Sequence, residues 1–162
     1  MAVRRIPRLV WRIIDVNANR AMEGARAAEE FVRFVLQERG LTARMRRLRH
    51  DIGHAVTRFP DEMSSRLAAR DTRRDVGRDA RPRRSQWTSL LSDNLQRLKE
   101  SLRVLEECAR AITPTTARHF QRLRFDAYAL EQAIHQRLAA LRDPGRRGAA
   151  RTRRRGRGIR RH

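Results

Sequence analysis

Seven polar residues, among them asparagines and arginines able to bind an anion, occur twice in the chain, with the same types and the same spacing. The first copy consists of Asn17, Arg20, Glu23, Arg26, Glu29, Glu30 and Arg33. The second copy follows at one constant offset and consists of Asn94, Arg97, Glu100, Arg103, Glu106, Glu107 and Arg110. Because arginine forks bind oxyanions through paired hydrogen bonds, a pair of asparagines and a pair of arginines that meet in space would form a site for an anionic ligand.

The asparagines and the first arginine of each copy are the strongest binding candidates. Asn17 and Asn94 flank the apolar side of their segments, where asparagine is a poor helix former and needs hydrogen-bond partners if it is buried. Arg20 and Arg97 follow one helical turn later. We therefore expect the asparagines to orient a substrate and the arginines to bind its phosphate. A buried polar network that only fixes the register of the helices explains the same four residues equally well.

The other repeated charges have a simpler interpretation. Oppositely charged residues three and four positions apart on an exposed helix face form ion pairs worth about 0.2–0.5 kcal/mol each. Such a ladder of solvated pairs is predicted for Glu23, Arg26, Glu30 and Arg33.

A second candidate site lies in the segment 70–77, which is rich in Arg and Asp and ends in glycine. Asp71 and Asp75 are predicted to hold Mg²⁺, which binds one or two carboxylates together with substrate phosphate oxygens, or to accept a proton. Arg70 would supply positive charge to a transferring phosphoryl group. The alternative is a polar linker with local Arg–Asp pairs, and the pattern alone favours it because the chain contains no glycine-rich phosphate loop.

Histidine and cysteine give no comparable signal. His50 and His54 have the spacing of zinc ligands on a helix, but no third ligand is evident, so an exposed helix face is the better interpretation. Cys108 is the only cysteine, which excludes an intrachain disulfide and a cysteine-based metal site.

Apolar residues at alternating steps of four and three accompany both polar copies, and this spacing predicts long amphipathic helices. The first stripe consists of Ile14, Ala18, Ala21, Ala25, Ala28, Val32 and Val35, and the second of Leu91, Leu95, Leu98, Leu102, Leu105, Ala109 and Ile112. Gly40 is predicted to end the first helix as a left-handed residue, and Thr113 and Pro114 to begin the last one. Helices are expected over about 8–38, 41–59, 61–67, 88–112 and 114–141, with Ser85 or Thr88 as the N-cap of the fourth, and a long loop is expected over 69–84.

A second motif is also duplicated, because Arg-Leu-Arg-x-Asp at 47–51 recurs at 122–126. The repeated unit is therefore a helix hairpin, and two hairpins predict an all-α four-helix bundle in which equivalent residues face each other across an approximate two-fold axis.

Length and charge complete the outline. At 162 residues the chain fits one domain, expected over 1–143, and its net charge is +21. The segment 144–162 contains nine arginines and no acid, and it is predicted to be a disordered tail able to contact nucleic acid without specificity. No segment reads as a membrane span or a secretory signal, so a cytoplasmic protein without a membrane partner is expected.

The segment 12–30 resembles the opening of a helical domain found N-terminal to thiamine phosphate synthase in some bacteria. Further motifs at 48–51, 69–77, 94–107 and 123–128 continue the resemblance over roughly 12–131. It implies an alternative hydroxymethylpyrimidine phosphate kinase, which makes the diphosphate from the monophosphate at the expense of ATP, with Mg²⁺, and with thiamine phosphate synthase as an expected partner. Ala27 and Ala28 replace the larger aliphatic residues usual in the family, and no synthase barrel is recognisable, so synthase activity is not implied.

Two other classes of function remain open. An arginine-rich helical module can bind RNA or DNA through phosphate contacts that require no motif. A degenerate member of the same family could instead serve as a scaffold for a partner enzyme.

Overall fold

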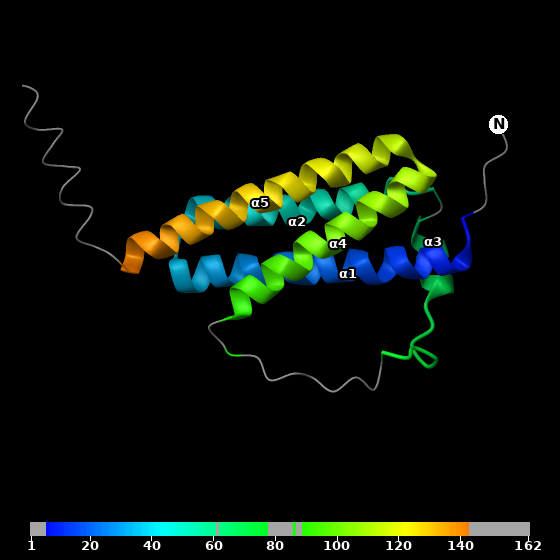
Figure 1. The fold of residues 1–162 in the computed structure, drawn as a ribbon, viewed down its shortest axis with the longest axis horizontal. Coiled ribbons are helices and arrows are strands. Elements are labelled where there is room, and N and C mark those ends of the chain that lie inside the picture. Colours follow the sequence, from blue (N-terminus) through cyan, green and yellow to red (C-terminus); the bar gives the residue numbers. More distant parts are fainter. Residues whose placement is uncertain (1–5, 61, 78–85, 87–88, 143–162) are drawn as a thin grey trace, which may run out of the picture.

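The structure is a computed structural model that describes residues 6–60, 62–77, 86 and 89–142, and this part of the chain contains helices and no strand (Figure 1). The first helix, α1, spans Arg8–Phe31 and continues into a π-helical turn, η1, at Val32–Leu36. The others are α2 at Arg39–Val56, α3 at Glu62–Ala69, α4 at Leu90–Ile112 and α5 at Pro114–Arg142. None of these helices is long and apolar enough to cross a membrane.

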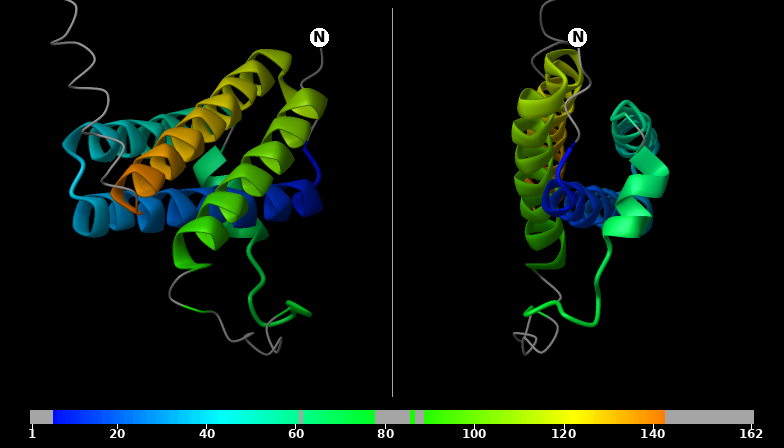
Figure 2. Two further views of the ribbon diagram at one scale, coloured as in Figure 1. Left: turned by 60° about the vertical axis from the view of Figure 1, so that its left-hand side comes forward. Right: turned by 90° about the vertical axis from the view of Figure 1, so that its right-hand side faces the viewer.

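The four long helices surround one core. Helix α1 packs against α2 and α4, and α5 packs against the same two helices, while the short α3 lies against α1. The α1–α2 hairpin and the α4–α5 hairpin form two layers, and neighbouring helices run in opposite directions (Figures 1 and 2). The predicted all-α fold of four main helices is confirmed, whereas the duplication of the hairpins stays a prediction.

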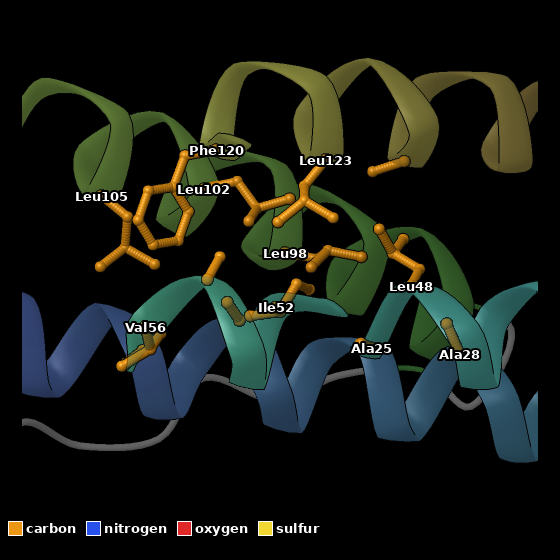
Figure 3. Packing of buried hydrophobic residues seen from close by; sticks show 14 of the residues in the cluster. Ala25, Ala28, Leu48, Ile52, Val56, Leu98, Leu102, Leu105, Phe120 and Leu123 are labelled. Carbon is orange, nitrogen blue, oxygen red and sulfur yellow. The ribbon is translucent and has the colours of Figure 1, made fainter. Parts of the chain in front are cut away.

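Small residues on α1 face large residues on α4. The buried stripe of α1 is dominated by alanine, and its partner on α4 by leucine, so small side chains of one helix face large side chains of the other (Figure 3). The contact is closest at Gly24, where a Cβ atom would lie 2.7 Å from the backbone oxygen of Asn94 and 3.3 Å from Leu98. Only glycine fits there.

An aromatic cluster closes one end of the core. The Phe59 ring, after α2, lies 6.1 Å from the Trp11 ring of α1 and 5.7 Å from the Phe120 ring of α5, measured between ring centres. All three side chains are buried, so they fasten the end of the α1–α2 hairpin to α5.

The connection between α1 and α2 differs from the prediction. Gly40 does not end the first helix; it lies inside the first turn of α2. The left-handed residue is Gln37, with φ of 52°, directly after the π-helical turn. Turning the chain at this point keeps Leu36 in the core, and this tertiary contact outweighs the local preference for glycine.

The start of α5 agrees with the prediction. Thr113 is extended, and its carbonyl oxygen accepts hydrogen bonds from the N–H groups of Thr116, at 2.9 Å, and Ala117, at 3.2 Å. Pro114 is the first helical residue, where a missing N–H costs nothing. The predicted disorder of the tail after residue 143 concerns residues outside those described.

Candidate functional site

Asn17, Arg20 and Arg97 line one pocket of about 700 Å³, formed by α1 and α4. We call it the α1–α4 pocket. Its other lining residues are Glu23, Asp93, Gln96, Glu100, Ser101 and Val104. The fold therefore brings the polar residues of both repeat copies to one place, as an anion site would need.

The two asparagines are buried and are bonded in the same way. The amide nitrogen of Asn17 donates to the carbonyl oxygen of Ile13 at 2.9 Å, and that of Asn94 donates to the carbonyl oxygen of Leu90 at 2.7 Å. Asn94 does not line the pocket, but its Oδ1 accepts a hydrogen bond from Arg97 Nη1 at 3.2 Å. Asn94 thus positions Arg97, while among the described residues no donor is bonded to Asn17 Oδ1.

The pocket mixes positive and negative side chains. Arg20 is exposed and has no hydrogen-bond or ion-pair partner among the described residues. Gln96 donates to Glu100 at 2.7 Å, and the hydroxyl of Ser89 is 2.7 Å from Asp93. Two arginines and three carboxylates suit a ligand that carries both phosphate and a cation.

The predicted ion-pair ladder is present only in part. Arg26 and Glu30 form an exposed pair at 2.8 Å, as expected. Glu23 is exposed as predicted, but it lines the α1–α4 pocket, so it belongs to the candidate site.

Arg70, Asp71 and Asp75 line a different pocket, of about 300 Å³, between α1 and the segment after α3. We call it the loop pocket. Its other lining residues are Arg12, Asp15, Val16, Asn19 and Thr72, and none of them lines the α1–α4 pocket. Val16 and Asn19 are the chain neighbours of Asn17 and Arg20, so the two pockets occupy adjoining faces of α1.

A buried carboxylate, Asp15, binds the arginines beside the loop pocket. Its two oxygens accept from Nε and Nη2 of Arg70, each at 2.8 Å, and from Nε of Arg66 at 3.2 Å. Burial alone would raise the pKa of Asp15, but the hydrogen bonds and charges of Arg70 and Arg66 outweigh it, and the pKa is lowered. Arg70, predicted to bind phosphate, therefore has two of its nitrogens engaged by a structural partner.

Asp71 and Asp75 each stabilise the loop with one oxygen. Asp71 Oδ1 accepts from the N–H of Arg74 at 3.2 Å, and Asp75 Oδ1 accepts from the N–H of Gly77 at 2.8 Å. The other oxygen of each carboxylate has no hydrogen-bond donor among the described residues and could bind a cation. Over the described ranges no group of three or more His, Cys, Asp or Glu side chains is placed to hold a metal ion. This donor set fits Mg²⁺ only if a ligand supplies further oxygens, as phosphates do.

Glu29 and Glu106, which hold equivalent positions in the repeat, are buried at 3% and 0% exposure. Glu29 accepts from Nε of Arg46 and Arg49 in α2, at 3.0 and 2.9 Å. Burial alone would raise the pKa of Glu29, but these two arginines outweigh it and lower the pKa. Glu106 accepts from Nε of Arg124 in α5 at 2.9 Å. Each carboxylate therefore ties together the two helices of one hairpin.

Sequence reasoning did not identify these buried carboxylates, although a signal was present. Asp15, Glu29 and Glu106 each lie four residues after one buried apolar residue and three before another. That spacing places them on the core-facing stripe, where a carboxylate must be paired.

The second duplicated motif contributes to a smaller pocket. Asp51 and Asp126, which hold equivalent positions in it, line a space of about 190 Å³ between α2 and α5, together with Arg44, Arg47, Leu48 and Leu130. His50 and His54 are exposed on α2, and in the described part of the chain no third ligand joins them.

Comparisons with a family model and with individual known proteins agree on one family. The ThiD2 family matches residues 12–133. Thiamine-phosphate synthase of Synechocystis sp. is 37% identical over 132 residues, which are 79% of this chain and 37% of that protein. The thiamine-phosphate synthase of Nostoc sp. is 34% identical over 141 residues, which are 86% of this chain and 40% of that protein. The thiamine-phosphate synthase of Rhodopirellula baltica is 33% identical over 138 residues, which are 83% of this chain and 36% of that protein. The chain thus spans well under half the length of these relatives, and no solved structure matches it.

Proposed function

Because the chain belongs to the ThiD2 family, we propose that it is a phosphotransferase of thiamine biosynthesis. The reaction would convert hydroxymethylpyrimidine phosphate to its diphosphate with ATP as phosphoryl donor. The names of the relatives support the pathway, and the family resemblance of the motifs supports the kinase step. The single observation that carries the proposal is that Arg20 and Arg97, from the two repeat copies, line one pocket.

The α1–α4 pocket would bind the phosphate of the pyrimidine substrate. Phosphoryl transfer depends on charge neutralisation and alignment rather than on covalent help from the protein. Arg20 and Arg97 would bind the phosphate oxygens, and Asn17 Oδ1 would accept a hydrogen bond from the pyrimidine. Asn94 would act through Arg97 as a positioning residue, because its Oδ1 already holds that guanidinium.

The nucleophile in this reaction is a phosphate oxygen. It attacks the γ-phosphorus of ATP, and the bond from that phosphorus to the β-phosphate oxygen breaks, so ADP leaves. A phosphate monoester has a second pKa of about 6 and is largely ionised at neutral pH, so the step requires no base. This chemistry favours a metal-binding role over a proton-accepting role for Asp71 and Asp75.

The loop pocket would hold the phosphates of the nucleotide with Mg²⁺ on Asp71 and Asp75. When bound, the metal would neutralise charge on the phosphate oxygens. The position of this pocket beside the α1–α4 pocket, along one stretch of α1, supports a transfer between the two.

Four of the described arginines are engaged by buried carboxylates and are not free to bind a nucleic acid. Arg66 and Arg70 are engaged by Asp15, and Arg49 and Arg124 by buried glutamates, so these guanidinium groups serve the fold. A phosphate surface needs arginines that are free to neutralise the backbone of the nucleic acid.

Turnover of matched variants tests the proposal. Arg20→Gln, Arg97→Gln, Asp71→Asn and Asp75→Asn should each lower the rate of diphosphate formation by about 10²-fold, the effect of removing a preorganised charge. Arg122→Gln is the control, since Arg122 is exposed and lines none of the pockets described above. If both arginine variants in the α1–α4 pocket turned over like the control, the assignment of that pocket would be wrong.

A further inference from the structure

Three arginines line a pocket of about 560 Å³ where α1 ends and α2 begins. We call it the turn pocket; its lining residues are Arg33, Gln37, Arg39, Thr42, Ala43 and Arg46. We propose that the turn pocket binds a small, multiply charged oxyanion, namely a diphosphate group. This site is distinct from the two pockets assigned to phosphoryl transfer, and the inference does not depend on that assignment.

The turn pocket differs from the other pockets in the charge of its lining residues. The three other pockets described above each contain at least two carboxylates, whereas no acidic residue lines this one. Within the described ranges neither Arg33 nor Arg39 forms an ion pair with a carboxylate. Arg33 and Arg39 therefore carry positive charge that no carboxylate of the described residues neutralises, and such charge in a concave surface indicates a site for an anion.

Two arginines of the turn pocket make contacts that hold their side chains in place and still leave N–H groups free for a ligand. The Arg33 guanidinium lies 4.7 Å from the centre of the Phe34 ring, a cation–π contact that leaves its N–H groups available. Arg46 uses Nε to bind Glu29, and half of its side chain remains exposed. Three arginines can thus present several N–H donors to a ligand that carries two phosphates.

The backbone adds to this positive charge. The first N–H groups of α2 have no partner within the helix, and the preceding residue, Glu38, makes no side-chain cap. Anions are favoured at such a helix start. The turn itself contains the left-handed Gln37, and strained residues of this kind persist where the surrounding structure holds them in place.

The turn pocket is too remote from the α1–α4 pocket to share in its chemistry. Arg33 follows Arg20 by thirteen residues, which is roughly 20 Å along a helix axis. A diphosphate bound here is therefore a separate ligand, either free inorganic diphosphate or the diphosphate part of a nucleotide.

Titration of the ¹⁵N-labelled full-length protein with inorganic pyrophosphate tests the inference. The amide resonances of Gly40 and Thr42, in the first turn of α2, should shift and saturate. In the double variant Arg33→Gln/Arg39→Gln the affinity read from these amides should fall by about tenfold or more, as for the loss of a charge-assisted hydrogen bond. Since neither arginine has a carboxylate partner among the described residues, the variant should melt like the wild type. Arg39→Gln alone is the substitute if it does not.

Two controls separate this site from other anion binding. Arg122→Gln removes an exposed arginine elsewhere, and Arg20→Gln/Arg97→Gln removes the arginines of the α1–α4 pocket; both should leave the Gly40 and Thr42 response unchanged. A parallel titration with ADP distinguishes a nucleotide from free diphosphate as the ligand. The inference is overturned if neither ligand saturates these amides, or if the Arg33/Arg39 variant responds like the wild type.

Discussion

Replacing Gly24 by alanine tests the close approach of α1 and α4. A Cβ atom at this position would lie 2.7 Å from the backbone oxygen of Asn94, and a backbone atom cannot rotate away as a side chain can. The added methyl group must therefore push the helices apart. Gly53 in α2 is the matched control, because a Cβ atom there would meet only Met22 Cε, at an ordinary 3.9 Å.

Two opposing effects decide the outcome. Glycine in a helix costs about 1 kcal/mol relative to alanine, so both substitutions gain stability from the backbone. Overpacking at a tight contact costs about 1–3 kcal/mol, and only Gly24→Ala incurs it. We expect Gly53→Ala to stabilise the protein by about 0.5–1 kcal/mol and Gly24→Ala to destabilise it by up to about 2 kcal/mol.

Thermal and urea unfolding followed by circular dichroism at 222 nm measures both variants. Each kcal/mol corresponds to about 2–4 °C in Tm for a chain of this size, so the two variants should differ by several degrees. Equal stabilisation by both substitutions would refute the contact between Gly24 and α4.

Three further outcomes follow from single side chains. Asp15→Asn should lower stability by about 1–3 kcal/mol at pH 7, because Arg66 and the partly exposed Arg70 lose hydrogen bonds to a buried carboxylate. Pairing with the arginines lowers the pKa of Asp15 below its ordinary value of 3.8. The stability that the Asp15 carboxylate contributes is therefore fully present above pH 3.8 and is lost as the pH falls through the lowered pKa. Urea unfolding from about pH 7 to about pH 2 should show the free energies of unfolding of the variant and the wild type becoming equal at low pH. Gln37→Gly should stabilise the fold by up to about 1 kcal/mol, since it relieves a left-handed φ of 52°, and an unchanged urea midpoint would contradict this. The Cys108 thiol should react slowly with a disulfide reagent at pH 8 until the protein unfolds. The reason is that burial, and to a smaller extent the negative charge of Glu107, raises the pKa of the thiol. A reaction rate equal to that of a free thiol would contradict this.

Much of the fold could be predicted because its signals are local. The alternating steps of four and three fixed the four long helices, and Thr113 with Pro114 marked the start of α5. The turn at Gln37 could not be predicted in this way. There Leu36 is buried in η1, which contacts α5 as well as α1 and α2, so the point where the chain reverses depends on residues distant in the sequence.

The candidate site was predicted in parts. The repeat identified Arg20 and Arg97, and the fold places them in one pocket. That Arg70, Asp71 and Asp75 line a separate pocket depends on the path of the chain after α3, which no local pattern encodes. The turn pocket was missed for a related reason: its arginines come from both sides of a helix connection and converge only in three dimensions.

The phosphorus NMR spectrum of a reaction mixture tests the central proposal most directly. The full-length protein is incubated with Mg·ATP and hydroxymethylpyrimidine phosphate, and the signals of all phosphates are followed over time. We expect the monoester signal to be replaced by the two signals of a pyrimidine diphosphate, with one ADP formed for each molecule of diphosphate. ADP formed together with inorganic phosphate, or no change while the protein remains folded, would contradict it.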